Sequence, residues 1–572
     1  MLTFRPRSTI DPPSPWFRAW RMATMLLLLG WTTGCASLPA NTNRVASTAF
    51  AQPEETALGQ LTVARRAQAG ARSDSAFHLL SDVDAALAAR IALIDDAQRT
   101  LDLQYYAIHA DASTEVLLQG LRNAARRGVR VRILLDDFNS VGKDTQVLRL
   151  AFEPNVQMRL FNPIPGSRQN MVGRILTSLD DVAGMQKRMH NKLFIADNAW
   201  GVTGGRNLGD VYFGAGDKQN FVDLDVLAAG RIVRDMSASF DRFWNDELAY
   251  PVQTLLSPED LDKLRKPEAP ASAPGGTAAG VTPAAAASLP VTVSPTVIPS
   301  VSPAAVARAD RAPLDLRTLS LTWAPSILLA DKPGKIGPGD DEVNAGETAI
   351  DGLLSLMQQA HHDVLIISPY FVPGEQMMAV YRQLRQRGVR MRVLTNSLAS
   401  NDAPAAHAGY ARYRQPLLDM GVELYEMRSA PETAAKLAGS GGGTHQGSGG
   451  WMGSGVGGSK GGTSRASLHS KVVIIDGYYA VIGSMNLDLR SQLKNSEVGL
   501  VIRSPALAQQ ATAHAENTLA TAAYRLERKD GHLYWRAPPG AGFADASSEP
   551  EASTKLKLLV KLLGPLAPDQ ML

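Results

Sequence analysis

The chain has 572 residues, of which 45% are hydrophobic, and it carries 58 Lys and Arg against 55 Asp and Glu. That length and apolar fraction are enough for two cores, so we expect two domains. The near balance of charge does not favour a nucleic-acid-binding protein, which we would expect to present a basic surface. The single cysteine excludes an intramolecular disulfide framework.

Residues 1–35 are predicted to be an export signal. Basic residues precede an apolar run that is too short to span a bilayer, and the run ends at Gly34-Cys35. A sole cysteine after Thr-Thr-Gly resembles a bacterial lipobox, which implies that Cys35 carries a lipid and becomes the mature N-terminus. Ordinary signal cleavage and an uncleaved anchor are the alternatives. In each case we expect an exported protein of the bacterial cell envelope, lipid-anchored on the periplasmic side if Cys35 is modified. Removing four Arg and one Asp with the signal leaves 54 basic and 54 acidic residues.

Two segments further along repeat one local pattern. Residues 122–137 (RNAARRGVRVRILLDD) and 382–397 (RQLRQRGVRMRVLTNS) are identical at seven of sixteen positions. Each predicts a helix, a Gly stop and then a strand. We therefore predict an α/β protein of two similar halves, residues 76–255 and 313–530.

The remaining segments lack a core-forming pattern. The predicted division is an N-terminal linker at 36–75, an Ala/Pro-rich linker at 256–312, a Gly/Ser-rich insert at 437–464 and a C-terminal tail at 531–572. The tail contains an amphipathic stretch, LKLLVKLLGPL, which fits either a packing helix or a helix on a membrane surface.

Each half also contains one copy of the pattern His-x-Lys-x-x-x-x-Asp, followed by a small-residue turn that ends in Asn seventeen residues after the His. Two copies that agree in spacing are strong evidence for a functional site. The copies consist of His190, Lys192, Asp197 and Asn207, and of His469, Lys471, Asp476 and Asn486.

The spacing predicts two hairpins. An apolar run (LFIA or VVII) follows each His-x-Lys and reads as a buried strand, so His and Lys point to one face. Asp197 and Asp476 complete the two motifs and are assigned to the catalytic set with the histidines and lysines. They stand where each strand breaks, and at turn positions they are as readily structural as catalytic.

Two facing sets of this kind can cleave a phosphodiester. One neutral imidazole attacks phosphorus to form a phosphohistidine, and the other, protonated, donates to the leaving alkoxide. The lysines and asparagines would bind the non-bridging oxygens. This chemistry requires no metal and no cofactor.

These residues resemble the phospholipase D superfamily, whose signature is this duplicated motif. The resemblance implies two α/β/α sandwich halves packed about a pseudo-two-fold axis, with His190 as nucleophile and His469 as general acid and base. It also implies a carboxylate that orients each histidine from further along the same half. The candidates are Asp223 and Glu497, with Asp225 as a rival to Asp223.

Within the superfamily, the chain looks most similar to bacterial cardiolipin synthases of the C type. The segments that carry this resemblance are LDLQYY, KRMHNK, GGRNLGDVYFGAG, LHSKVVIIDG and GSMNLDLRS. It implies a phosphatidyltransferase that acts on phosphatidylglycerol, and on phosphatidylethanolamine as a second donor, at a membrane surface without nucleic acid. Tyr105, Tyr106 and Tyr370 would either line the lipid cleft or pack in the core.

Three alternatives stay open at this point. A phospholipase D would pass the same intermediate to water and release phosphatidic acid. A phosphodiesterase acting on nucleic acid would need a basic groove. A non-catalytic lipoprotein that binds phospholipid would form no phosphohistidine.

Overall fold

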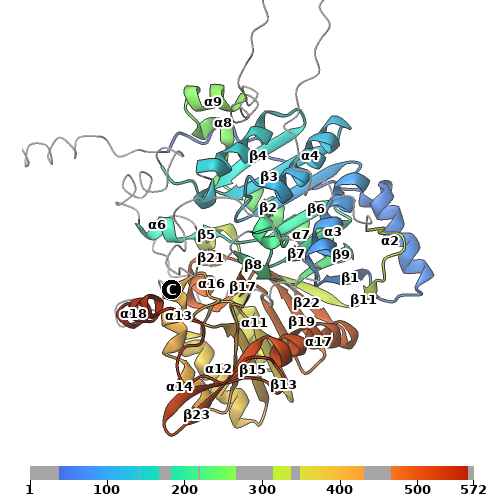
Figure 1. The fold of residues 1–572 in the computed structure, drawn as a ribbon. Coiled ribbons are helices and arrows are strands. Elements are labelled where there is room, and N and C mark those ends of the chain that lie inside the picture. The colour runs from blue at the N-terminus through green and yellow to red at the C-terminus, as the bar shows by residue number, and fades with distance from the viewer. Residues whose placement is uncertain are drawn as a thin grey trace, which may run out of the picture.

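The computed structural model describes residues 38–140, 142–165, 182–216, 219–265, 314–336, 348–430 and 465–564. The predicted export signal and the Gly/Ser-rich insert lie outside the described residues, and so does the Ala/Pro-rich linker from residue 266 onward. Figure 1 shows two α/β halves, the N-terminal one in blue and green and the C-terminal one in yellow and red.

The first half is built on a nine-stranded sheet in the order β10-β4-β3-β2-β6-β7-β9-β1-β11. Strands β2, β3 and β4 run parallel, while β6, β7, β9 and β1 are antiparallel to their neighbours. The strands are β1 (Ser75–Leu80), β2 (Thr100–Tyr105), β3 (Arg130–Asp136), β4 (Val156–Phe161), β6 (Leu193–Ala196), β7 (Trp200–Gly204), β9 (Asp225–Gly230), β10 (Ala249–Pro251) and β11 (Thr322–Trp323).

The second half repeats this sheet in the order β24-β23-β16-β15-β13-β18-β19-β22-β12. Its parallel strands β13, β15 and β16 take the places of β2, β3 and β4, and the β18–β19 hairpin takes the place of β6–β7. The strands are β12 (Ser326–Ala330), β13 (Asp363–Ile367), β15 (Arg390–Asn396), β16 (Glu423–Met427), β18 (Val472–Ile475), β19 (Tyr479–Gly483), β22 (Val498–Arg503), β23 (Ala523–Lys529) and β24 (His532–Arg536).

Helices cover both faces of each sheet. The helix starts follow from their sequences, because Asp82, Asp111 and Thr348 each accept a backbone N–H at an N-terminus. The predicted Gly stops are present, since Gly128 and Gly388 follow α4 and α12 with φ of 95° and 80°. The main helices are α3 (Val83–Asp96), α4 (Ala112–Arg126), α7 (Arg231–Trp244), α11 (Ala349–Met357), α12 (Gly374–Gln386) and α17 (Pro505–Thr521).

Shorter elements complete the described chain. The helices are η1 (Pro53–Glu55), α2 (Ala57–Gln68), η2 (Asp137–Asn139), η3 (Gly142–Phe152), α6 (Val182–Gln186), η5 (Asp210–Tyr212), α8 (Val252–Leu255), α9 (Pro258–Arg265), η6 (Pro333–Ile336), α13 (Pro404–Ala411), α14 (Arg414–Asp419), α16 (Leu489–Leu493) and α18 (Thr554–Leu563). The strands are β5 (Arg188–Met189), β8 (Gln219–Val222), β14 (Phe371–Val372), β17 (Arg465–Leu468), β20 (Leu487–Asp488) and β21 (Asn495–Ser496).

A shared apolar core joins the halves. It contains Phe240 of α7 and Ala511 of α17, together with sheet residues from both halves such as Ile195 and Ile474. Two further cores lie under the outer helices of each half, one against α3 and α4 and the other against α11 and α12. The predicted fold class, two similar α/β/α halves, is confirmed.

Four of the predicted boundaries differ from the structure. Residues 258–265, placed in the Ala/Pro-rich linker, form α9, and Leu264 packs against the first core. Residues 57–68, placed in the N-terminal linker, form α2, which buries Leu58 against the first core. Residues 322–323, placed in the second half, form β11 and pair with β1 of the first sheet. Residues 532–536, placed in the tail, form β24 and close the edge of the second sheet. Each of these short segments is held by contacts with distant residues, which a local pattern does not record.

No helix among the described residues is both long enough and apolar enough to cross a membrane.

Candidate active site

Two small parallel strand pairs between the halves carry the predicted histidines. Strand β5 of the first half pairs with β21 of the second, and β17 of the second half pairs with β8 of the first. His190 follows β5 and donates its backbone N–H to Ser496 at 3.0 Å. His469 follows β17 and donates its backbone N–H to Val222 at 2.8 Å. In Figure 1 these four strands lie where the two halves meet.

The strand pairs bring each histidine to a carboxylate of the opposite half. Nδ1 of His190 lies 3.0 Å from both carboxylate oxygens of Glu497, the residue after β21. Nδ1 of His469 lies 2.7 Å from Asp223, the residue after β8. The expectation that each carboxylate orients the histidine of its own half is therefore wrong. Parallel pairing sets the residue after one strand beside the residue after its partner, and here the partners belong to different halves.

Asp225, the rival to Asp223, has another role. Its carboxylate forms buried ion pairs with Arg90 at 2.9 Å and Arg206 at 3.5 Å. It also lies against Gly204, where a Cβ atom would stand 2.1 Å from the Asp225 Oδ1 atom. Asp225 therefore holds the end of β7 in place and does not orient a histidine.

Lys192 and Lys471 are buried close to both histidines. Each ammonium donates to the carbonyl of the histidine two residues before it, at 2.8 Å for Lys192 and 2.5 Å for Lys471. Burial lowers the pKa of Lys192 to about 7 and that of Lys471 to about 8. The positive charge of Lys471 contributes to the lowered pKa of Lys192, so the two ammonium groups converge on one site.

The histidines are held in the neutral form. Burial and the neighbouring charges of Lys192 and Lys471 keep the pKa of His190 well below its ordinary value, and the same causes lower that of His469. With both imidazoles neutral, the positive charges of Lys192 and Lys471 balance the negative charges of Glu497 and Asp223. A phosphodiester would add one negative charge, which favours uptake of one proton by one imidazole, as a general acid requires.

The pH dependence of kcat/KM follows from these groups. We expect a maximum near pH 7. Burial raises the pKa of Glu497 to about 7, so its negative charge is lost as the pH falls through 7. The lysines lose their charge as the pH rises through about 7 and 8. The kcat profile should extend further to the alkaline side because a bound phosphodiester raises the lysine pKa values. Initial rates across pH would check this, and a flat kcat/KM from pH 5 to 10 would contradict it.

The two asparagines differ in their contacts. Asn207 donates to the hydroxyl of Tyr212 at 2.9 Å and accepts from the backbone of Ala107 at 3.3 Å. The side-chain oxygen of Asn486 is buried and has no hydrogen-bond partner among the described residues. The amide of Asn207 has two N–H donors, so the one not bonded to Tyr212 would serve the predicted phosphate-binding role.

Asp197 and Asp476 do not face the histidines, which corrects their assignment as catalytic residues. Each stands at the far end of its strand with φ of 53°. Asp197 accepts three backbone N–H groups at the start of β2, from Gln98, Arg99 and Thr100. Asp476 accepts those of residues 361–363 at the start of β13. Burial alone would raise the pKa of Asp476, but these N–H donors lower it.

Replacement of Asp197 by Ala should therefore act on stability. One buried and two part-buried N–H groups would lose their acceptor, at a cost of about 1–3 kcal/mol in the free energy of unfolding. The activity per folded molecule should stay close to that of the unaltered protein. Denaturant unfolding alongside kcat at low temperature would separate the two effects, and a folded variant with a kcat reduced more than about tenfold would favour a catalytic role.

The small residue two positions before each motif Asn differs between the halves, and this gives the two histidines different surroundings. In the second half, Ser484 donates to Glu497 at 2.5 Å, and Ser491 donates to the same carboxylate at 2.8 Å. In the first half the equivalent position is Gly205, where a Cβ atom would lie 2.3 Å from the Asp223 carboxylate. Glu497 shares its charge with two hydroxyl donors, whereas Asp223 makes a shorter bond to its histidine. A protonated imidazole is therefore better stabilised at His469, which fits the general acid.

The Gly205→Ser variant should show how closely Asp223 must fit. The added side chain must displace the carboxylate from His469, and we expect kcat to fall about 10²-fold, the size of a misplaced catalytic group. The reciprocal change, Ser484→Gly, removes one hydrogen bond and creates no clash, so its effect should be several times smaller. Equal effects of the two variants in a steady-state assay would contradict this difference.

Comparison with known proteins places the site in a family. Residues 91–244 and 353–519, together more than half of the chain, match the family model described as "Cardiolipin synthase, PLD-like domain". The chain belongs to this phospholipase D-like family. It is 35% identical to cardiolipin synthase C of Escherichia coli K12 over 87% of this chain and 96% of that protein. It is 25% identical to cardiolipin synthase A of Pseudomonas entomophila over 76% of this chain and 66% of that protein.

A solved structure is also similar to this chain. Phosphatidylserine synthase of Haemophilus influenzae Rd KW20 is 15% identical, with a TM-score of 0.47 over 81% of this chain and 91% of that one. The family match and the E. coli relative confirm the resemblance drawn from the duplicated motif, and they make this chain an enzyme of the phospholipase D superfamily.

Aromatic rings surround the histidines of this family member. The ring of Tyr106 meets His190 edge-on at 5.2 Å between centroids. The ring centroids of Tyr212 and Phe221 lie 5.3 Å and 4.7 Å from that of His469. Neither was predicted, although Tyr212 belongs to the segment GGRNLGDVYFGAG and Phe221 lies two residues before Asp223. Tyr105, in contrast, is a core residue, since its hydroxyl accepts from the buried Arg90.

Tyr370 lies on the second-half side of the site. Its hydroxyl donates to Asp402 at 2.8 Å, and the charge of Asp402 acts on both Lys471 and Tyr212. The sequence carried no signal for Asp402, because it stands in an irregular segment before α13.

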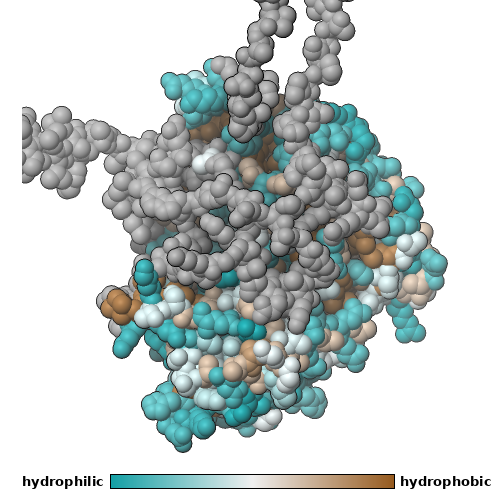
Figure 2. All heavy atoms as spheres, viewed as in Figure 1, coloured by the Kyte–Doolittle hydropathy of each residue, from teal (hydrophilic) through white to brown (hydrophobic). Residues whose placement is uncertain are grey.

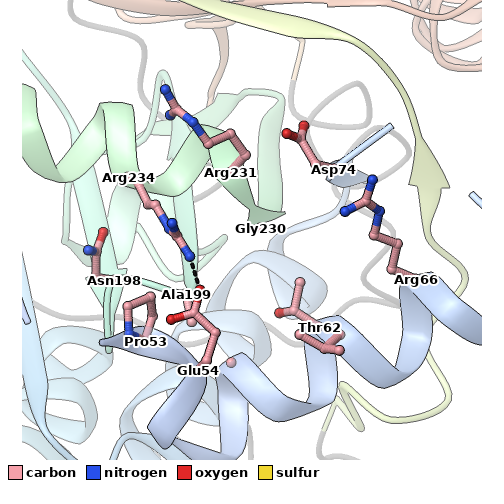
Figure 3. A pocket seen from close by; sticks show the side chains of 12 residues that line it. Pro53, Glu54, Thr62, Arg66, Asp74, Asn198, Ala199, Gly230, Arg231 and Arg234 are labelled. Carbon is pink, nitrogen blue, oxygen red and sulfur yellow. Dashed lines mark hydrogen bonds and ion pairs between the residues drawn. The ribbon is translucent and has the colours of Figure 1, made fainter. Parts of the chain in front are cut away.

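A surface cavity of about 240 Å³ lies away from the histidines (Figure 3). It is bounded by α2, the start of α7 and the turn after β6, at the opposite end of that hairpin from His190. Its arginines have partners, since Arg234 pairs with Glu54 and Arg231 with Asp235. The cavity is therefore separate from the candidate active site.

Proposed function

We propose that this protein transfers a phosphatidyl group between phospholipids through a covalent phosphohistidine. Nδ1 of each histidine faces a carboxylate, so Nε2 is the reactive nitrogen. Nε2 of His190 attacks phosphorus while the bond from phosphorus to the head-group oxygen breaks, and His469 gives its proton to that oxygen. His469 then takes the proton of the acceptor hydroxyl as its oxygen displaces Nε2 from phosphorus.

One observation carries the proposal: two histidines and two lysines lie at one buried site, and a buried carboxylate of the opposite half holds each histidine. The arrangement supplies a neutral nucleophile, a second imidazole for proton transfer and two cations for the phosphoryl oxygens. Both halves must be in contact for either histidine to be oriented.

A lipid substrate is favoured over nucleic acid. Arginines of the repeated segments 122–137 and 382–397 are used inside the fold, since Arg132 pairs with Asp102 at 2.6 Å and Arg392 with Asp363 at 2.7 Å. They are thus not available as a row of phosphate contacts. The similarity to cardiolipin synthase C supports phosphatidylglycerol as acceptor, with phosphatidylglycerol or phosphatidylethanolamine as donor.

The test is a lipid assay with purified protein and phosphatidylglycerol, with and without phosphatidylethanolamine, followed by mass spectrometry. Cardiolipin formation that is lost in His190→Ala and His469→Ala supports the proposal. The matched control is His361→Ala, which removes an exposed imidazole. Phosphatidic acid as sole product would make the protein a phospholipase D, and turnover of neither lipid would overturn the proposal.

We also propose that Cys35 anchors the protein in the cell envelope. The basic and apolar stretch before Gly34-Cys35, and the absence of any other cysteine from the sequence, support this proposal. Labelled fatty acid should be incorporated in the unaltered protein and lost in Cys35→Ala. Incorporation that persists in the variant, or that never occurs, would contradict a lipid on this cysteine.

A further inference from the structure

The C-terminal helix α18 packs on the second half through one face only. It lies beside α13, and Leu556 on this face is 5% exposed. Ser553 caps the start of the helix, since its side chain accepts from the N–H of Leu556, and Arg412 donates to the carbonyl of Gly564 just after the helix ends. Figure 1 shows α18 next to α13 at the outer edge of this half.

The opposite face of α18 is apolar and basic. Leu558 and Leu562 are 57% and 59% exposed, and at a spacing of four residues they lie one turn apart. Among the described residues only six large hydrophobic side chains are exposed, and these two are the only leucines. Figure 2 shows hydrophobic side chains in brown at the position of α18. Lys555, Lys557 and Lys561 flank the leucines, and the helix contains no acidic residue.

Ion pairs fix the segment that carries α18. Glu549 pairs with the buried Arg414 at 2.5 Å, and Glu551 pairs with Arg428 at 2.5 Å. Glu551 also accepts from the hydroxyl of Ser429 at 3.0 Å. The exposed leucines are therefore presented by a helix held at both ends, which reduces the entropy lost on docking.

One helix connects α18 with the candidate active site. α18 packs on α13, which begins two residues after Asp402, and the carboxylate of Asp402 binds Tyr370 and acts on Lys471.

We propose that α18 docks this protein on an anionic phospholipid bilayer, with Leu558 and Leu562 inserted at the interface and the lysines against the head groups. Exposed leucines between lysines are the pattern of a helix that lies in the plane of a membrane surface. The charge of the helix matches an anionic lipid surface and not a basic partner. The inference concerns binding and does not depend on the proposed transfer chemistry.

A fluorescent probe at one position tests the docking. Cys35 is the only cysteine, so the full chain with Cys35→Ser and Leu558→Cys carries a single label on α18. With vesicles of phosphatidylglycerol and phosphatidylcholine, an environment-sensitive dye at 558 should shift to the blue, and it should do so equally in a His190→Ala background. The matched control carries the dye at Tyr478→Cys, a residue that is 42% exposed in the turn after β18, and should not shift.

Three outcomes of the dye experiment would overturn the inference: no shift at 558, an equal shift at 478, or a shift at 558 without vesicles that grows with protein concentration. The last would indicate a second copy as the occupant. As a second measure, Leu558→Gln with Leu562→Gln should weaken vesicle binding of the Cys35→Ser chain about tenfold or more. The control pair Val45→Gln with Val63→Gln should leave it unchanged, and equal loss in both pairs would also contradict docking through α18.

Discussion

The His190→Ala variant should form no phosphoenzyme and lose at least about 10⁴-fold in kcat, because no other group can take the phosphatidyl group in its place. The His469→Ala variant should lose a similar factor with natural lipids, since the alkoxide would leave without a proton. A phosphatidyl ester of p-nitrophenol distinguishes the nucleophile from the general acid, because the nitrophenolate leaves without being protonated.

With that ester, His469→Ala should release a burst of about one nitrophenolate per enzyme and then stop, because the base for the second step is missing. His190→Ala should give no burst. The unaltered protein should turn over continuously. A burst in His190→Ala and none in His469→Ala would reverse the two assignments.

Asp223→Asn and Glu497→Gln should each lower kcat by about 10³–10⁴-fold, the size of effect seen when the carboxylate that orients a catalytic histidine is neutralised. The structure makes their consequences different. Asp223 holds His469, so Asp223→Asn should slow breakdown of the phosphohistidine and let it accumulate. Glu497 holds His190, so Glu497→Gln should slow its formation.

Rapid quenching with the nitrophenyl ester would distinguish the pairings. Crosswise orientation predicts a burst in Asp223→Asn and a slow approach to steady state in Glu497→Gln. Orientation within each half predicts the opposite. Gly204→Ala offers a control for general disturbance near Asp223, because its Cβ would strike Asp225, which touches neither histidine.

Much of the site could be predicted because the chain is duplicated. Two motifs at one spacing fixed the histidines and lysines, and the repeated helix–stop–strand segments fixed two similar halves. The pairing of carboxylates with histidines depends instead on β5 with β21, strands of two residues each, and on β17 with β8, strands of four. Strands this short carry no alternation that a sequence pattern could reveal.

The length of the strand between each histidine and its Asp is enough to predict that Asp197 and Asp476 lie far from the histidines. Seven residues separate His190 from Asp197, and a strand rises about 3.3 Å per residue, so the two ends of the motif stand roughly 20 Å apart. Motif membership suggested a catalytic role, but strand geometry places these carboxylates at the opposite end of the sheet. Asp402 and Ser491 could not be predicted, because only the tertiary fold brings them to Tyr370 and Glu497.

The central claim is that a histidine of one half takes the phosphatidyl group while the other half supplies its carboxylate. The most direct measurement is peptide mass spectrometry of the Asp223→Asn variant, quenched during turnover of the phosphatidyl ester of p-nitrophenol, whose leaving group needs no proton from His469. The account predicts a phosphatidyl group on the peptide that contains His190. A modified peptide containing His469, or turnover that leaves both peptides unmodified, would contradict it.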